Sequence, residues 1–240
     1  MNALSYDGAL AVIIIIILIM CDVRFKHHFK CLLAGPSAAG KTTWICRFLR
    51  ERDNLIDAKV KQVVFYYDQW QELYDSMARE KLVDEFVKGK PTVETFQKLA
   101  HHEKNTTVLV VIDDQQHRAD PDLARIFQVT ARHSGCSVMY LCQSLFSPKK
   151  SHREISLQAD YIVLFRNPRD MLSISHFARQ VCPGKSNVLV DIYREATKKP
   201  YSYLLMDFHQ MTNNHLRFRT NIFKGDDDGC QAYVMHEDGV

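Results

Sequence analysis

The chain contains no pair of cysteines with the short C-x-x-C spacing that is typical of redox and zinc motifs. Its seven cysteines are an odd number, so they do not suit a complete framework of disulfides. Several of them lie within apolar runs, where cysteine usually serves as a small core residue. These are Cys31, Cys46, Cys136 and Cys142. We therefore expect free thiols in a reducing, intracellular compartment.

The chain also lacks an apolar run of the roughly 20 residues that a membrane-spanning helix requires. Its longest run, Ala9 to Cys21, has 13 residues, and no Lys or Arg precedes it as in a secretory signal. Three interpretations of residues 1–24 stay open: a buried strand or poorly ordered extension, a membrane anchor, or a translation start assigned too early. We expect the first of these, and no membrane partner.

Internal repeats and low-complexity linkers are absent from residues 25–220, where apolar runs alternate with helical patterns. This alternation predicts an α/β fold with a mainly parallel, helix-flanked sheet. The expected strands are Phe29–Ala34, Val63–Tyr67, Val108–Ile112, Ser137–Leu141 and Tyr161–Phe165, followed by a C-terminal hairpin of Tyr201–Phe208 and His215–Thr220. Apolar spacing predicts one long helix from Trp70 to Phe86. We further expect a basic loop at Lys149–Arg153, and Asn167-Pro168 as the cap of the helix that follows.

Charge is distributed unevenly along the chain. The net charge is +3, but residues 225–240 hold five acids and no Lys or Arg. Without them the body carries 31 basic and 28 − 5 = 23 acidic residues, a net +8. We therefore predict an apolar extension (1–24), a globular domain (25–223) and an acidic, disordered tail (224–240). A basic body is compatible with a nucleic-acid partner.

The central motif is Gly35-Pro36-Ser37-Ala38-Ala39-Gly40-Lys41-Thr42, between a strand-like run and the amphipathic segment Thr43–Arg52. Strand, glycine-bounded loop and helix together are typical of a phosphate-binding loop. Backbone N–H groups of such a loop surround a polyphosphate, and glycine fits its crowded bends. Lys41 can reach the β- and γ-phosphates, and the Thr42 hydroxyl can bind Mg²⁺. We assign Gly35 to Thr43 to the binding of ATP with Mg²⁺.

Hydrolysis also requires a carboxylate at a strand end to hold Mg²⁺, and a group that positions water. Two predicted strands end in aspartate, at Asp68 and Asp113. We prefer Asp113 as the metal-holding residue because its strand is the more apolar and a second acid follows it. Asp114 would then polarise the attacking water. Gln143, just beyond the next strand, would sense the γ-phosphate or orient water.

Six segments occur in a fixed order between residues 25 and 223: GPSAAGKT, VLVVIDDQ, YLCQSLF, ISLQADYIVLFRNPRD, ARQVCPG and YSYLLMDFHQ. In this series the chain resembles the genome-packaging ATPases of Maverick/Polinton elements and adintoviruses, within the HerA–FtsK branch of P-loop ATPases. The resemblance implies an additional-strand P-loop NTPase fold, in which the strand of Gln143 lies between those of Lys41 and Asp113. Many relatives have Asp-Glu where this chain has Asp113-Asp114.

The same resemblance implies a mechanism and a set of binding partners. It implies a ring of identical subunits that pumps double-stranded DNA, independently of sequence, into a capsid. Capsid portal or vertex proteins would be partners, and the ring would be associated with the virion in the host nucleus or cytoplasm. Such a ring needs an arginine at the γ-phosphate, usually from the neighbouring subunit. The candidates are Arg132, Arg153, Arg166, Arg169 and Arg179, of which we prefer Arg166 and Arg169.

Two other functions remain compatible with the motifs. A P-loop kinase acting on a nucleotide or small molecule would need a mobile basic lid, which Lys149–Arg153 could supply. A membrane-tethered nucleotide-binding protein without catalysis would explain the apolar N-terminus. DNA-stimulated ATP turnover separates the motor from the kinase.

Overall fold

The computed structural model describes residues 22–101, 107–113, 121–130, 134–145, 150–226 and 229–235. The apolar run at 9–21 and three residues of interest, Asp114, Arg132 and Lys149, lie outside this set. Within the described part of the chain, no helix combines the length and the apolar character needed to cross a membrane.

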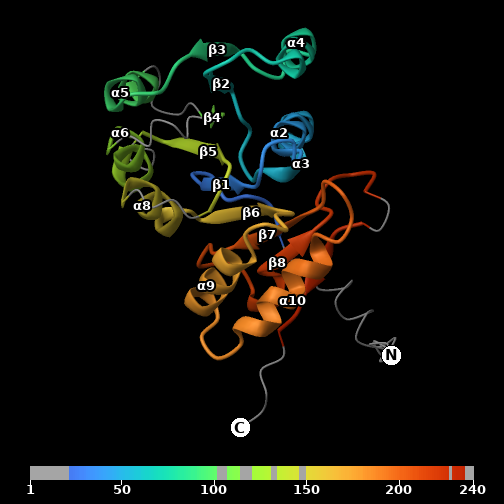
Figure 1. Cartoon of the computed structure of the whole chain (residues 1–240). Coiled ribbons are helices and arrows are strands. Elements are labelled where there is room, and N and C mark those ends of the chain that lie inside the picture. The colour runs from blue at the N-terminus through green and yellow to red at the C-terminus, as the bar shows by residue number, and fades with distance from the viewer. Residues whose placement is uncertain are drawn as a thin grey trace.

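A single sheet runs through the molecule in the strand order β3-β2-β4-β5-β1-β6-β7-β8-β9 (Figure 1). The strands are β1 (Lys30–Ala34), β2 (Gln62–Tyr67), β3 (Glu85–Lys88), β4 (Val108–Ile112), β5 (Cys136–Cys142), β6 (Tyr161–Phe165), β7 (Tyr203–Asp207), β8 (Phe218–Thr220) and β9 (Gln231–Tyr233). Strands β1 to β6 pair in parallel, whereas β7, β8 and β9 are antiparallel. The predicted α/β class, parallel sheet and C-terminal hairpin are confirmed.

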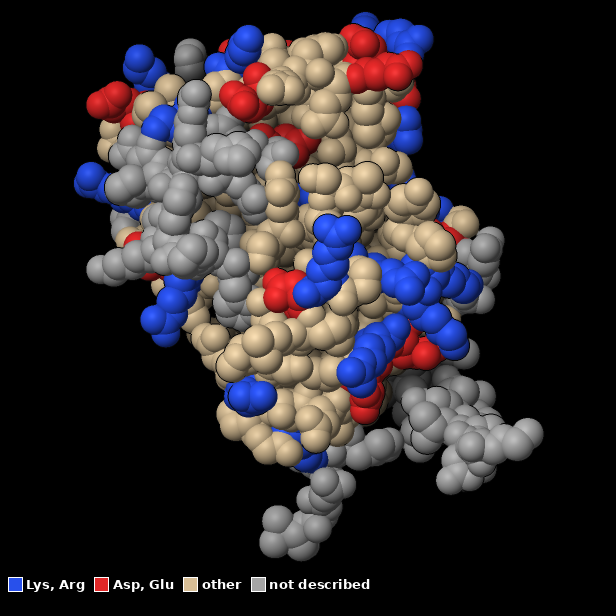
Figure 2. Space-filling model, in the orientation of Figure 1, with Lys and Arg blue, Asp and Glu red and all other residues tan. Residues whose placement is uncertain are grey.

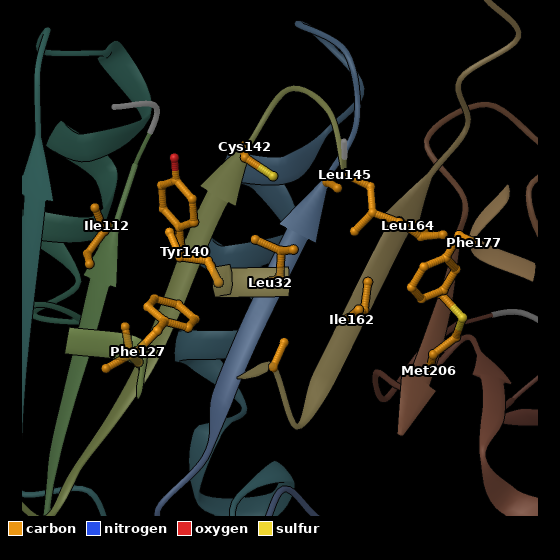
Figure 3. Packing of buried hydrophobic residues seen from close by; sticks show 14 of the residues in the cluster. Leu32, Ile112, Phe127, Tyr140, Cys142, Leu145, Ile162, Leu164, Phe177 and Met206 are labelled. Atoms are coloured by element: carbon orange, nitrogen blue, oxygen red, sulfur yellow. The ribbon is translucent and has the colours of Figure 1, made fainter. Parts of the chain in front are cut away.

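Helices cover both faces of this sheet (Figure 1). They are α2 (Lys41–Arg50), α3 (Arg52–Leu55), α4 (Glu72–Arg79), α5 (Val93–His101), α6 (Pro121–Arg125), the π-helix η2 (Ile126–Thr130), α8 (Lys150–Gln158), α9 (Met171–Val181), α10 (Ser186–Ala196) and the 3₁₀-helix η3 (Asn214–Leu216). One apolar cluster joins the sheet to α6, η2, α9 and α10, and a second joins it to α2 and α4. Successive side chains of β1 alternate between the two clusters, because strand residues point to opposite faces. Figure 3 shows Leu32, Tyr140 and Ile162, from three neighbouring strands, on the same face.

The strand order fixes where the functional residues gather. Strand β5, which precedes Gln143, lies between β1, which leads to Lys41, and β4, which leads to Asp113. This is the additional-strand arrangement that the sequence resemblance implies, and it is confirmed. Because these strands are parallel, their carboxyl ends meet at one edge of the sheet, where α/β folds bind ligands.

The long helix expected from Trp70 to Phe86 is wrong. Helix α4 ends at Arg79, and Lys81 adopts a left-handed conformation with φ 52° that no helix can continue. Residues Glu85–Lys88 then form β3, which pairs in parallel with β2 at the edge of the sheet. Phe86 suits a helical spacing and a short edge strand equally well, so its placement depends on the non-local pairing with β2.

Two local predictions after β5 also need correction. The expected basic loop at Lys149–Arg153 is wrong, because α8 begins at Lys150. The cap of α9 is Asp170 rather than Asn167, because the Asp170 side chain accepts a 3.3 Å hydrogen bond from the backbone N–H of Ser173. The Asn167 side chain accepts instead from the backbone N–H of Arg169.

The prediction of a disordered tail from residue 224 is wrong for part of that segment. Residues Gln231–Tyr233 form β9 and pair with β8. Asp226 forms a 2.6 Å ion pair with Arg47 of α2. The acidic composition indicated solvation, but it could not show that β8 offers an unpaired edge to this segment.

Candidate nucleotide-binding site

The loop between β1 and α2 has the backbone of a phosphate cradle. Gly40 has φ 96°, in the left-handed region that favours glycine. Gly35 packs so closely against β6 that a Cβ there would lie 2.6 Å from Cβ of Phe165. Both glycines of the motif are therefore required by the geometry, one for its backbone angle and the other for lack of space. Within the predicted Gly35–Thr43 segment, residues 35–40 form this loop and Lys41–Thr43 form the first turn of α2.

Lys41 is folded into this loop rather than extended into solvent. Its Nζ donates hydrogen bonds to the carbonyl oxygens of Gly35, at 2.7 Å, and Pro36, at 2.9 Å. The residue is only 9% exposed. The ammonium group is thus held within the same cradle that would surround a phosphate, and it also contributes to the order of the loop.

Thr42 and Asp113 lie together at the start of α2 and the end of β4. The Thr42 hydroxyl donates to Oδ2 of Asp113 at 3.3 Å, and Asp113 is 3% exposed. A hydroxyl and a carboxylate are the oxygen donors that hold Mg²⁺ beside phosphates in proteins. These residues therefore fit the metal that the motif implies, and the predicted pair of Thr42 and Asp113 is brought together.

A third residue in contact with Asp113 was missed from the sequence. Tyr74 of α4 donates a 2.6 Å hydrogen bond from its phenol to Oδ2 of Asp113, and its side chain is buried. Its ring packs on Phe65, with the ring centroids 5.0 Å apart. In the sequence Tyr74 is one more aromatic residue of a helical pattern, and nothing there distinguishes it from an ordinary core residue.

The other predicted residues are placed around the same edge. The backbone N–H of Gly35 donates to the carbonyl of Cys142 at 3.2 Å, so Gln143 follows directly beside the P-loop. Arg166 and Arg169 follow β6 and are exposed, and Arg166 donates to the backbone carbonyl of Lys198 at 3.4 Å. Asp114, the predicted water-polarising residue, lies outside the described residues.

A cavity of about 640 Å³ extends from the P-loop past the first turns of α2. Its lining includes Lys41, Thr42, Arg47, Tyr201 and Tyr203. Burial raises the pKa of the Tyr203 phenol well above its usual range, so this side chain stays neutral. The cavity therefore offers a positively charged end at the P-loop and, beyond it, a wall that includes the aromatic rings of Trp44, Tyr201 and Tyr203. Such a combination suits a charged polyphosphate attached to a flat organic group.

No protein-family model matches the chain, and no curated protein matches it either. Solved structures of similar fold include the genome packaging NTPase B204 from Sulfolobus turreted icosahedral virus 2 in complex with AMPPCP. That similarity has 19% identity and a TM-score of 0.48, over 77% of this chain and 95% of the other. EssC (ATPases 2 and 3) from Geobacillus thermodenitrificans is similar at 10% identity and a TM-score of 0.45, over 61% of this chain and 34% of that one. At these values the similarities show nothing about activity.

Proposed function

We propose that this protein is an ATPase that converts ATP hydrolysis into translocation of double-stranded DNA, and that it packages a viral or virus-like genome into a capsid. The observation that carries the proposal is the position of β5 between the strands of Lys41 and Asp113. This order, together with the serial sequence resemblance, supports an additional-strand P-loop motor. Mg²⁺, when bound, would neutralise charge that develops on the phosphates.

The roles of the chain's own residues follow from their places. The P-loop amides and Lys41 would bind the β- and γ-phosphates, with Lys41 exchanging its carbonyl partners for phosphate oxygens. Thr42 and Asp113 would hold the metal. Gln143 at the end of β5 would orient the attacking water, with Asp114 as the group that polarises it. Because an arginine can stabilise the transferring phosphoryl group from a neighbouring subunit, Arg166 and Arg169 would complete the site in a ring.

Positive charge near the nucleotide edge supports a nucleic-acid partner. Figure 2 shows Lys and Arg side chains over α10 and beside the end of β6, with Asp and Glu side chains among them; Arg194 and Lys198 form ion pairs with Asp191 and Glu195. The exposed basic residues of these segments are Arg166, Arg169, Arg194, Lys198 and Lys199. Arg153 of α8 is also exposed. A backbone-directed contact of this kind would be independent of DNA sequence, and capsid portal or vertex proteins would be further partners of the ring.

The kinase alternative requires a mobile basic lid at 149–153. In the structure α8 begins at Lys150, so residues 150–153 are helical and do not form the expected loop. The membrane-tethered alternative depends on residues outside the described part of the chain.

The decisive experiment measures ATP turnover with and without duplex DNA. The full chain should hydrolyse ATP, and duplex DNA should raise the rate. Lys41→Ala should abolish turnover in both conditions, because Lys41 is the cation inside the phosphate cradle. A wild-type chain that binds ATP but shows no response to DNA would contradict a DNA motor.

A salt series tests the partner separately. Contacts to six to ten phosphates cost roughly 10³–10⁵ in affinity between 50 and 200 mM salt. Unrelated duplexes should therefore bind alike and should all dissociate steeply as salt rises. A strong preference for one sequence, or a flat salt response, would argue against the proposed partner.

A further inference from the structure

Tyr201 occupies a backbone position that normally belongs to glycine. The backbone N–H of Ser202 donates to the carbonyl of Lys199 at 3.3 Å, which closes a turn with Pro200 and Tyr201 at its centre. Tyr201 has φ 63°. Turns with proline second and a positive φ third favour glycine at the third position, because a Cβ there is strained. The side chain of Tyr201 is therefore retained at a cost to the backbone, and such strain concentrates at functional sites.

The fold carries this strained residue to the P-loop. Strand β7 runs antiparallel to β6, with Tyr203 opposite Phe165, so β7 begins at the edge where the parallel strands end. A Cβ added to Gly40 would lie 3.5 Å from both Cβ and Cδ1 of Tyr201. Tyr201 is nevertheless 71% exposed, and it lines the same cavity as Lys41 and Thr42.

The wall of the cavity around Tyr201 is held firmly. Tyr203 packs edge-on against Trp44, with the ring centroids 5.7 Å apart. Arg47 lies 4.3 Å above the ring of Phe223 and forms its ion pair with Asp226. The rings of Trp44, Tyr203 and Phe223 pack on one another, whereas Tyr201, which also lines the cavity, is largely exposed. A flat group attached to a P-loop polyphosphate would meet this open ring.

We propose that Tyr201 is the stacking surface for the base of the bound nucleotide. This inference rests on the proposed ATP site. It adds a contact to the base, which is the part of a nucleoside triphosphate that an inorganic polyphosphate lacks. Stacking on an aromatic ring contributes affinity with little preference for the identity of the base, because every base has a π-face. Tyr201 thus makes the site selective for nucleotides over inorganic polyphosphates.

Calorimetric binding of ATP and of inorganic tripolyphosphate, each with Mg²⁺, tests this role. Tyr201→Gly removes the ring but retains a residue suited to φ 63°. It should weaken ATP binding about tenfold and leave tripolyphosphate binding unchanged. Tyr201→Phe keeps the aromatic face and should bind ATP as the wild type does. The melting temperature of Tyr201→Gly should not fall, because relief of strain offsets the greater freedom of glycine in the unfolded chain.

Lys81→Gly provides a matched control, because Lys81 also has a left-handed backbone, with φ 52°, but lies at the end of α4. It should leave both affinities unchanged. ATP affinity that is equal in wild type and Tyr201→Gly would overturn the inference while leaving the ATP site intact. An equal loss for ATP and tripolyphosphate would also overturn it, since Tyr201 would then shape the P-loop instead. A wild-type chain that binds neither ligand would instead overturn the proposed function itself.

Discussion

The phenol of Tyr74 donates its hydrogen bond to the same oxygen of Asp113, Oδ2, that accepts from the hydroxyl of Thr42. The shorter of the two bonds, at 2.6 Å, comes from Tyr74 and not from the P-loop side. Helix α4 therefore fixes the orientation of the carboxylate that we propose to hold Mg²⁺. This is the kind of supporting hydrogen bond that keeps a ligand aligned with its metal.

Tyr74→Phe should consequently weaken the binding of Mg²⁺ rather than the binding of phosphate. The ring and its packing remain, but Asp113 loses the donor that orients it. Removal of such a supporting partner typically costs 10–100-fold, so we expect about a tenfold higher Mg²⁺ concentration for half-maximal ATP turnover. High Mg²⁺ should restore most of the rate. The measurement is a Mg²⁺ titration at saturating ATP.

Tyr67→Phe is the control for this effect, because the Tyr67 ring packs 5.9 Å from that of Tyr74 in the same aromatic cluster. It should leave the Mg²⁺ requirement unchanged. If Tyr74→Phe shows an unaltered Mg²⁺ requirement, the hydrogen bond has no positioning role.

The sequence was sufficient where local pattern and fold agree. The continuous apolar run Val108–Ile112 is typical of a central strand of a parallel sheet, and all five residues of β4 are buried. The P-loop was likewise predictable, because its glycines are required by the conformation of the loop itself. The order of the strands could not be predicted from any one segment. It was predicted from the family resemblance.

The sequence failed where the deciding partner is distant in the chain. Strand β3 exists because β2 offers it a parallel edge, and no local pattern near Phe86 encodes that edge. The contact of Tyr74 with Asp113 joins residues 39 positions apart. Tyr201 was also overlooked, because only its backbone angle and its place beside Gly40 set it apart.

A buried ion pair gives a prediction about stability. Arg219 of β8 and Asp207 of β7 are 1% and 2% exposed, and they lie 2.7 Å apart. Burial raises the pKa of Asp207, although the charge of Arg219 opposes that shift. Arg219→Met leaves this carboxyl buried without its partner, so we expect a loss of about 3–5 kcal/mol in the free energy of unfolding. Urea denaturation measures it.

The double variant Arg219→Met with Asp207→Asn should recover most of that loss, because no uncompensated charge then remains and the amide oxygen can still accept from the His209 N–H and the Thr212 hydroxyl. If the single and double variants are equally unstable, the lost packing of Arg219 is responsible rather than the charge.

His27 gives a prediction about pH. Burial lowers its pKa to about 4, and the neighbouring His28 contributes further, while Asp57 opposes the shift. An unfolded histidine has a pKa of about 6.5, so between these values the unfolded chain binds the extra proton. The contribution of His27 is therefore lost as pH falls from about 6.5 towards 4. The melting temperature of His27→Gln should depend less on pH in this window than that of wild type.

The exposed His215 in η3 is the matched control, and His215→Gln should retain the wild-type pH profile. A His27→Gln profile that is parallel to wild type throughout this window would mean that other groups set the acid sensitivity.

The last prediction concerns the arginine that we propose completes the site in a ring. Arg166 and Arg169 are exposed beyond β6, at the edge of the sheet that carries Lys41. In a ring, such an edge can present an arginine to the nucleotide of the neighbouring subunit. Loss of an arginine of this kind costs about 10³–10⁵ in rate. Isolated chains should therefore hydrolyse ATP slowly, and activity should rise more steeply than linearly with protein concentration until rings form.

A mixing experiment decides whether the arginine acts between subunits. Lys41→Ala and an arginine-to-alanine variant at 166 or 169 should each be inactive alone. Mixed rings should regain part of the activity, because an intact Lys41 site can then face an intact arginine from its neighbour. A chain that carries both substitutions, mixed with Lys41→Ala, should restore nothing, because no subunit of such a ring has Lys41. The informative comparison is therefore quantitative: recovery with the two single variants must exceed recovery with the double variant. Equal values in demonstrably mixed rings would place the arginine within its own subunit or exclude the residue chosen.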